Sequence, residues 1–319
     1  MSALNTGRTA VPTQTGVGAA VRTRLRGRRR DTGAIWRGLF FASAIFLVIS
    51  IAAILVMVGR QAAALFTQVR PLAFLFGRVW APEHGLYGAL PFLVGSLAAT
   101  GLALLIGVPL GLAGAIYLAK LATPRAQRVM RPAIELLAGI PSVVYGWVGL
   151  TALVPFIRRH SGHVTGFGLL AAGVVLAVMV LPTFISLAED ALRAVPQDIE
   201  HGSLALGTTR WQTIAHVLIP AAWPGIAAAG ILSMARAIGE TMAVQMVLGN
   251  SPVIPAGLIV PASTLTSEIV LEMGSTPQGS PANNALFAMG LLLLLISLGL
   301  IIAVRATRKE ATAGVRQAH

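Results

Sequence analysis

The sequence predicts an all-α membrane protein, a polytopic bundle of six transmembrane helices with both termini in the cytoplasm. Of its 319 residues, 55% are hydrophobic and only 11% are charged, and the mean hydropathy is +0.78. A soluble domain carries about a quarter charged residues, so this chain is expected in a membrane. The sequence has no cysteine, which excludes disulfides and thiolate metal sites. Its six histidines show no metal-ligand spacing, so we expect neither a metal nor a cofactor.

Six stretches are long enough for a spanning helix, which needs roughly 20 apolar residues. Pro109 is expected to kink the second span, and Pro141 and Gly146 are expected to bend or break the third. In chain order the expected spans are 38–59, 88–119, 136–157, 167–187, 223–248 and 285–304.

The basic residues set the orientation and the ends of the domain. With the N-terminus inside, 18 lysines and arginines fall on the inner side and five on the outer side, which follows the positive-inside rule. The net charge of +13 is therefore expected to anchor the chain to membrane lipid, and we expect no nucleic-acid partner. We expect residues 1–33 to form a disordered basic cytoplasmic arm, residues 34–305 to form the transmembrane domain, and residues 306–319 to form a cytoplasmic tail.

The segment between the fourth and fifth spans predicts a helical hairpin at 196–220. Pro196 suits the first turn of a helix, and Gly207 suits the left-handed residue that ends one. Thr209 and Gln212 form a capping-box pair that starts a second helix, and Pro220 is expected to stop it. Such a hairpin either lies on lipid or docks a cytoplasmic partner, and the pattern alone leaves both possibilities open.

The hairpin resembles the cytoplasmic signature of ABC importer permeases, which is Glu-Ala-Ala, three residues, Gly, nine residues and an aliphatic-x-Leu-Pro ending. Gly207 and Pro220 match that spacing, with Ile219 in place of Leu. The start differs, because His201 stands at the position of the family's Glu and Glu200 comes one residue early. The resemblance implies coupling to an ATPase through these residues: Glu200, His201, Gly202, Leu204, Ala205, Gly207 and Trp211.

Two further stretches, LAGIPSVVYG at 137–146 and RAIGETMAVQMVLGN at 236–250, resemble the PstC-type permease subunits of phosphate ABC importers. The matches cover roughly residues 88–305. The resemblance implies a MetI-like ABC permease fold in a bacterial cell membrane, with inorganic phosphate as substrate and this chain forming half of the pathway. It also implies a PstA-type second permease subunit, a cytoplasmic PstB-type ATPase dimer, and a PstS-type phosphate-binding protein outside the membrane. The sequence contains no G-x-x-x-x-G-K-[ST] loop, so ATP hydrolysis is expected on the separate ATPase.

Arg236 and Glu240 stand inside the apolar run 223–248. Because they are four residues apart, we expect them on one face of a continuous helix. A charge in the middle of a membrane costs at least about 2.5–3.5 kcal/mol, so neither should face lipid. Either the two only pair with each other and tie the bundle together, or they line the substrate pathway with Thr241 adding a hydroxyl. We favour the pathway, since arginine binds phosphate oxygens as a fork and a nearby carboxylate would keep that hold weak enough for release.

Three alternatives remain for the function. The substrate could be another oxyanion or a phosphonate. An ion-coupled secondary transporter would be supported by inverted repeats, and a membrane enzyme such as a phosphotransferase by clustered carboxylates or histidines; the sequence shows neither feature.

Arg131 and Glu135 are expected to form a structural ion pair at the cytoplasmic edge of the third span.

Overall fold

The computed structural model describes the backbone of residues 17–317 and the side chains of residues 36–305. It separates into two units, residues 1–57 and residues 58–319. Helix α1 (Val17–Leu65) passes through both of them. Its backbone is helical from Val17, inside the segment that the sequence assigns to the basic arm, and residues 1–16 lie outside the described part of the chain.

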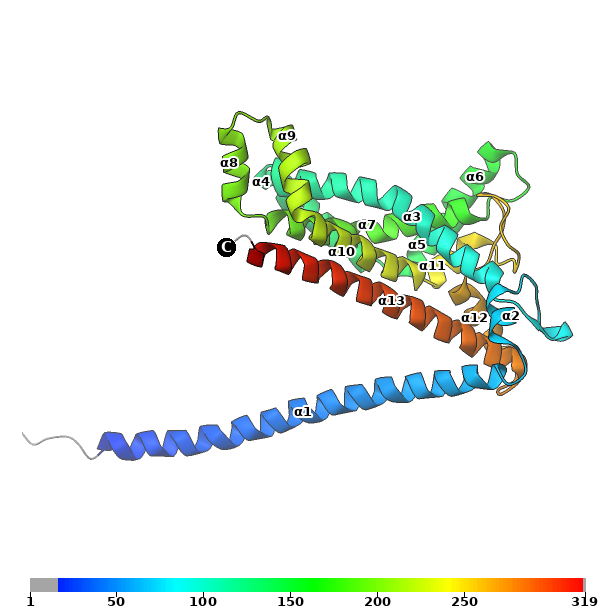
Figure 1. Cartoon of the computed structure of the whole chain (residues 1–319), viewed down its shortest axis with the longest axis horizontal. Coiled ribbons are helices and arrows are strands. Elements are labelled where there is room, and N and C mark those ends of the chain that lie inside the picture. The colour runs from blue at the N-terminus through cyan, green and yellow to red at the C-terminus, as the bar shows by residue number, and fades with distance from the viewer. Residues whose placement is uncertain (1–16, 318–319) are drawn as a thin grey trace, which may run out of the picture. The chain divides into compact units, whose positions relative to one another are not determined.

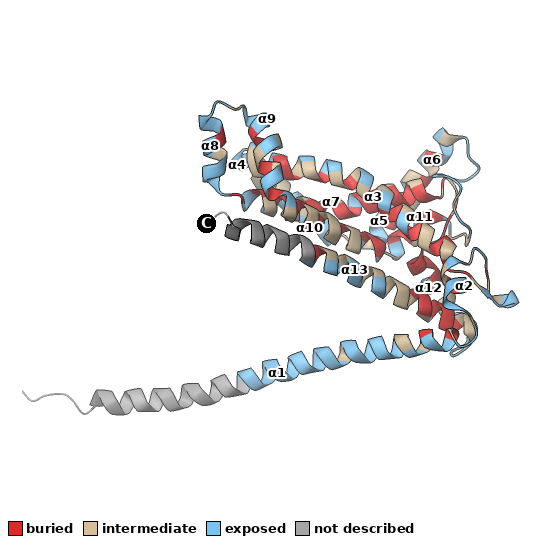
Figure 2. Ribbon diagram, in the orientation of Figure 1, coloured by how far each residue is buried: buried red, intermediate tan, exposed pale blue. Residues whose placement is uncertain are grey.

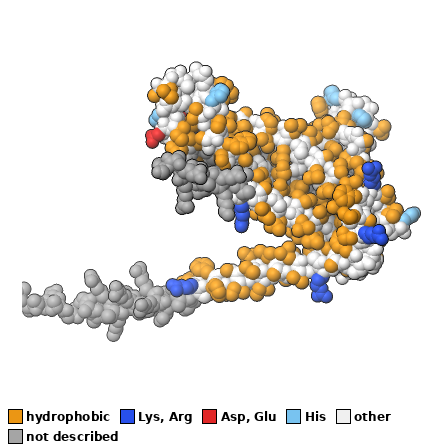
Figure 3. All heavy atoms as spheres, viewed as in Figure 1, with side chains coloured by type: hydrophobic (Ala, Val, Ile, Leu, Met, Phe, Trp, Pro, Cys, Tyr) orange, Lys and Arg blue, Asp and Glu red, His pale blue; other side chains and the backbone are white. Residues whose placement is uncertain are grey.

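Five helices of the described chain are long and apolar enough to cross a membrane, and a bent helix pair raises the number to six. Charged side chains lie near the ends of these helices, while hydrophobic side chains cover most of the visible surface between the ends (Figure 3). The straight candidates are Trp36–Phe66, Leu90–Leu121, Leu169–Arg193, Arg210–Ile238 and Pro281–Arg305. The sequence therefore predicted the first, second, fourth and sixth spans well, whereas the third and fifth differ in an informative way.

The first span is apolar on every side. In the span Trp36–Phe66 the most apolar window of 18 residues has a mean hydropathy of 2.9 and none of its residues is buried within the chain. Figure 2 shows this part of α1 as exposed along its length. A helix that is hydrophobic all round fits a lipid environment, so composition alone accounts for this element.

The outer segment after α1 folds against the ends of the spans. It consists of α2 (Pro71–Phe76), a short 3₁₀ turn (Pro82–His84) and two antiparallel strands, β1 (Trp80–Ala81) and β2 (Leu86–Tyr87), with Trp80 opposite Tyr87. Gly85 closes the turn at φ +70°, a conformation that favours glycine. The Trp80 ring packs edge-on against Phe92, with 5.3 Å between ring centroids, which joins this segment to α3.

Helices α3 (Leu90–Ile116) and α7 (Leu169–Arg193) form the centre of residues 58–319, and Figure 2 shows many buried positions along both. Small residues allow the two backbones to approach closely, as is typical of membrane helices. A Cβ on Gly111 would lie 2.6 Å from the Phe184 ring, and one on Gly173 would lie 2.6 Å from the Leu102 side chain. Helix α3 runs through Pro109 and ends in a π-helical turn, η2 (Tyr117–Leu121).

The third span is broken. Helix α4 (Pro124–Gly139) and the helix that follows, Ser142–Ser161, meet at an angle of 92°. Proline has no backbone N–H and disfavours helix at the preceding residue, so Pro141 accounts for the break, as the sequence predicted. The second part comprises α5 (Ser142–Val148), a π-helical turn η3 (Gly149–Leu153) and α6 (Val154–Ser161). The Tyr145 hydroxyl donates to the Leu137 carbonyl at 2.7 Å and so spans the break.

The predicted hairpin at 196–220 is present, and Figure 1 shows α8 and α9 side by side at one end of the bundle. Its elements are α8 (Gln197–Ala205), α9 (Arg210–Thr213) and a π-helical turn η4 (Ile214–Leu218). Gly207 has φ +86° in the turn, and Thr209 and Gln212 form the predicted capping box. The prediction that Pro220 stops the second helix is wrong, because η4 continues directly into α10 (Ile219–Ile238). Proline fits a first helical turn, and the π-helical widening just before it makes room for the ring.

The fifth span ends earlier than the sequence predicted. Helix α10 stops at Ile238, and a separate helix, α11 (Met242–Leu248), begins after Thr241. The chain then turns through Gly249 at φ +92°. It continues into α12 (Leu265–Met273), which starts with a capping box between Thr264 and Ser267. The last helix, α13 (Pro281–Gln317), packs against α10 and α12.

Candidate functional site

Arg236 lies in the last turn of α10 with its side chain exposed. Its Nη1 donates to the Thr183 hydroxyl of α7 at 2.7 Å. Tyr145 of α5 is close enough to interact electrostatically with the guanidinium. Three elements therefore meet around one cation, and within the described residues that cation has no carboxylate partner.

Glu240 does not share a helical face with Arg236, which corrects the prediction of one continuous helix. It stands in the interruption between α10 and α11, and no ion pair joins it to Arg236 among the described side chains. Its Oε1 instead accepts the Ala243 N–H at 3.4 Å, in the first turn of α11. A carboxylate at this place is favoured by the unpaired N–H groups and the positive end of the helix dipole.

Thr241 lies in the same interruption and immediately precedes α11. Its hydroxyl donates to the Gly239 carbonyl at 3.4 Å, so it is turned back on its own chain. From the other side, the Thr266 hydroxyl of α12 donates to the Glu240 carbonyl at 3.0 Å. The break is thus held by side-chain and backbone bonds, and Arg236 is the charged group that remains available at its edge.

The hairpin exposes most of the residues that were predicted to couple to an ATPase. Exposed predicted residues are His201, Gly202, Leu204, Ala205, Gly207 and Trp211. Leu206 is 87% exposed and Trp211 is 65% exposed, which are high values for large apolar side chains. An exposed apolar group rimmed by polar residues is typical of a protein interface.

Glu200 is the exception among these predicted residues. Its Oε2 lies 2.6 Å from the Nζ of Lys120 in η2 at the end of α3. The carboxylate is therefore engaged within the chain. Sequence reasoning missed this ion pair because its members are 80 positions apart and no local pattern connects them.

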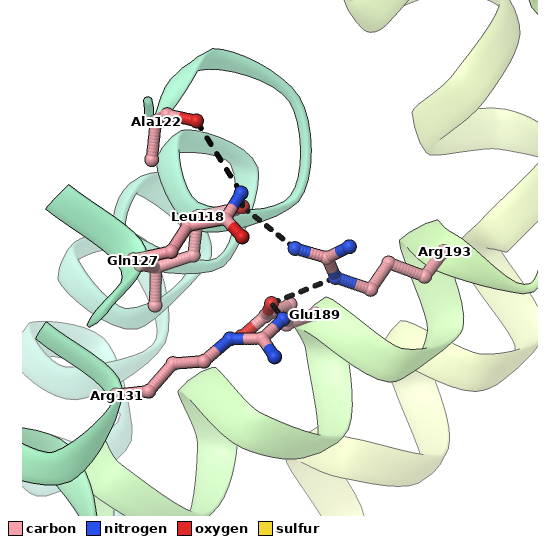
Figure 4. A network of polar contacts seen from close by, with 6 residues as sticks. All are labelled: Leu118, Ala122, Gln127, Arg131, Glu189 and Arg193. Atoms are coloured by element: carbon pink, nitrogen blue, oxygen red, sulfur yellow. Dashed lines mark hydrogen bonds and ion pairs between the residues drawn. The ribbon is translucent and has the colours of Figure 1, made fainter. Parts of the chain in front are cut away.

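A second charged group lies at the cytoplasmic ends of α3, α4 and α7, and Figure 4 shows its members pointing toward one another. The buried Glu189 Oε1 accepts from Arg131 Nη2 at 2.5 Å and from Arg193 Nε at 2.8 Å. Arg193 Nη2 also donates to the Leu118 carbonyl at 3.0 Å, and Gln127 Nε2 donates to the same oxygen at 3.1 Å. The predicted pair of Arg131 with Glu135 is wrong: Arg131 of α4 bonds to Glu189 of α7, and no ion pair joins it to Glu135 among the described side chains.

The segment between α11 and α13 holds a buried carboxyl group in α12. Glu268 is 4% exposed, and burial, together with repulsion from the neighbouring Glu272, raises its pKa to about 7. Glu272 accepts a hydrogen bond from the Trp80 indole at 3.1 Å. Within the part of the chain that the structure describes, no group of three or more His, Cys, Asp and Glu side chains is placed to hold a metal.

A sequence profile of the family described as "Binding-protein-dependent transport system inner membrane component" matches residues 107–310. The chain belongs to this family. It is therefore a multi-pass protein of the bacterial inner membrane, and a transport component rather than an enzyme. Permeases of this family work with a substrate-binding protein and with an ATPase on a separate subunit.

Curated relatives of this permease extend the match over most of its length. It is 46% identical to the "Probable ABC transporter permease protein YqgH" of Bacillus subtilis (strain 168), with 84% of this chain and 88% of the relative covered. It is 34% identical to the "Phosphate transport system permease protein PstC" of Haemophilus influenzae, with 76% and 83% covered. The protein of the same name from Mesorhizobium japonicum is 33% identical, with 90% and 95% covered.

Solved structures match the fold of this permease. A chain of the bacterial alginate ABC transporter in complex with an alginate pentasaccharide-bound periplasmic protein gives a TM-score of 0.60 at 15% identity, covering 88% of this chain and 97% of that chain. The inward-facing MetNI methionine ABC transporter gives 0.52 at 24% identity, covering 72% and 99%. The predicted all-α, MetI-like ABC permease fold is confirmed.

Proposed function

We propose that this chain is the transmembrane permease subunit of an ATP-driven inorganic phosphate importer and forms half of its translocation pathway. Relatives that are named as PstC and cover most of the chain support phosphate as the substrate. By the same likeness, its partners are a PstA-type second permease, a PstB-type ATPase dimer and a PstS-type phosphate-binding protein. The hairpin at 196–220 docks the ATPase through its exposed apolar residues.

The observation that carries the proposal is Arg236, which has no carboxylate partner among the described residues at the end of a membrane span. Phosphate carries one or two negative charges and needs a compensating cation in a medium of low dielectric. Arginine stays charged and presents a planar fork that matches phosphate oxygens. The neutral Thr183 hydroxyl orients the guanidinium without neutralising it, so Arg236 is left able to bind an anion.

Release requires that this hold be weak. In our proposal Glu240 and Thr241 act by fixing the interruption after α10, where the Glu240 carboxylate bonds to α11. Arg236 then lies at the end of α10 and moves with this helix. ATP-driven closure of the ATPase moves the hairpin and with it α10, which begins immediately after η4. The site thereby opens to alternate sides of the membrane.

The test is uptake of labelled phosphate by cells that lack their own importer and carry Arg236→Gln. We expect uptake to be abolished while the variant still inserts and copurifies with the ATPase. Arg37→Gln is the control, because this exposed arginine lies at the cytoplasmic end of the first span and the remaining arm residues keep the positive-inside bias. Normal phosphate uptake by Arg236→Gln would exclude the proposed role of this residue.

The same assay separates the alternatives for the wild-type protein. Competition by unlabelled sulfate or phosphonate stronger than competition by phosphate would assign another oxyanion importer. Uptake that continues without the copurified ATPase would instead indicate an ion-coupled carrier.

A further inference from the structure

The hairpin is joined to the spans by a sheltered ion pair. Lys120 Nζ lies 2.6 Å from Glu200 Oε2, and the two side chains are 12% and 28% exposed. No other ion pair among the described side chains connects the hairpin to the bundle. Because solvent reaches this pair poorly, salt screens it less than it screens an exposed pair.

Lys120 belongs to η2, the π-helical end of α3, and the same turn is held from a second side. The Leu118 carbonyl of η2 accepts from Arg193 of α7 and from Gln127 of α4. Arg193 in turn shares the Glu189 carboxylate with Arg131 of α4 (Figure 4). Polar bonds therefore join α8 to η2, and η2 to α7 and α4, with the backbone of η2 connecting Lys120 to Leu118.

This connection leads toward the proposed anion site. Helix α4 ends at the 92° break, and across that break the Tyr145 hydroxyl bonds to the Leu137 carbonyl of α4. Tyr145 interacts electrostatically with Arg236. A displacement of α8 that pulls on Lys120 would thus reach both elements that flank Arg236 on this side, α5 and α7.

An apolar cluster offers a competing explanation for how the hairpin is held. Val195, Ile214 and Leu218 are buried against Ile116 of α3 and Leu192 of α7. These contacts would keep the hairpin in place without any ion pair. They are not directional, however, whereas a partly buried ion pair holds two side chains at one distance. The apolar contacts therefore account for the attachment of the hairpin to the bundle. The ion pair accounts for the transmission of hairpin movement to the spans.

Resting on the proposed function, we propose that Lys120 and Glu200 are positioning residues that transmit the ATP-driven movement of the hairpin to α3, α4 and α7. In this assignment Glu200 contacts its own chain and not the ATPase. Loss of either residue would leave the ATPase docked and active but would disconnect hydrolysis from transport.

The experiment uses the complete complex, with its ATPase and binding protein, reconstituted in vesicles. The measured quantity is labelled phosphate transported per ATP hydrolysed. Lys120→Met and Glu200→Gln should each lower this ratio by about fivefold or more, the lower range of coupling between linked sites. Copurification of the ATPase should be retained. The conservative Lys120→Arg variant should keep most of the ratio.

The charge-swapped double variant, Lys120→Glu with Glu200→Lys, makes the test specific. Recovery of a large part of the transport ratio supports the ion pair, because the double variant again places opposite charges side by side. Each single change instead places like charges side by side and should lower the ratio. Asp190→Asn is the matched control: it removes an exposed carboxylate next to Glu189 that makes no ion pair in the described chain. It should leave the ratio unchanged.

Two results would overturn the proposal. One is a normal ratio in Lys120→Met and Glu200→Gln. The other is loss of the ATPase from Glu200→Gln alone with no recovery in the swap, which would place Glu200 in the docking contact. Failure of the phosphate assignment appears instead in the wild-type complex, and the ratio is then measured with the oxyanion that the wild type transports. The two failures are therefore distinguishable.

Discussion

Replacing Glu189 with glutamine should destabilise the protein measurably. The change keeps the shape of the side chain but leaves Arg131 and Arg193 without the charge that both of them share. A hydrogen bond to a charged group contributes about 1.5–3 kcal/mol when it is sheltered, whereas an exposed ion pair contributes about 0–1 kcal/mol. The Glu189 side chain is 8% exposed, but those of Arg131 and Arg193 are 45% and 38% exposed. We therefore expect a loss of about 2 kcal/mol for the two bonds together.

The assay is thermal unfolding of the purified protein in detergent, followed by intrinsic tryptophan fluorescence. For a chain of 319 residues each kcal/mol corresponds to roughly 1.5 °C in Tm, so Glu189→Gln should unfold roughly 3 °C below the wild type. The neighbouring Asp190→Asn should change the free energy of unfolding by less than about 0.5 kcal/mol. Equal Tm values for the two variants would show that the shared carboxylate does not hold α4 and α7 together.

Two further predictions concern the segment between α11 and α13, which contains Glu268 and Ser263. Because the pKa of Glu268 is raised from 4.5 to about 7, the folded state between these values holds a proton that the unfolded state has released, and the free energy of unfolding should fall as the pH rises through this range. Glu268→Gln should flatten that dependence in a Tm-against-pH series, and an unchanged slope would contradict the assignment. A Cβ on Gly95 would lie 2.1 Å from the Ser263 carbonyl oxygen, so Gly95→Ala should cost about 1–3 kcal/mol in a denaturation assay. On the same helix, Gly101 has open space around it, so a loss as large in Gly101→Ala would refute the steric explanation.

Hydropathy and charge predicted the membrane class, four of the spans and the hairpin, because each depends on local composition. The same signals could not predict where an apolar stretch is interrupted. The stretch from 223 to 248 is apolar apart from a few polar residues, and Arg236 and Glu240 are its only charged residues. Nevertheless α10 stops at Ile238 and α11 begins at Met242. Once that helix is broken, a four-residue spacing no longer places Arg236 and Glu240 on one face. The shared helical face of these two residues was inferred from a continuity that the chain does not have.

The charged contacts at the cytoplasmic end illustrate a second limit. Glu189 and Arg193 are four residues apart, and their pairing is visible in the sequence. Arg131 also lies four residues before Glu135, but it bonds to Glu189, 58 positions away. Local spacing gives both possibilities equal weight, and only the packing of α4 beside α7 decides between them.

The close approach of α3 and α7 has a consequence for how the protein can move. Where glycine lets a neighbouring ring or branched side chain rest directly on the backbone, as at Gly111 and Gly173, the two surfaces interlock, and sliding would require the helices to separate first. We therefore expect these helices to tilt together as one rigid body during the transport cycle.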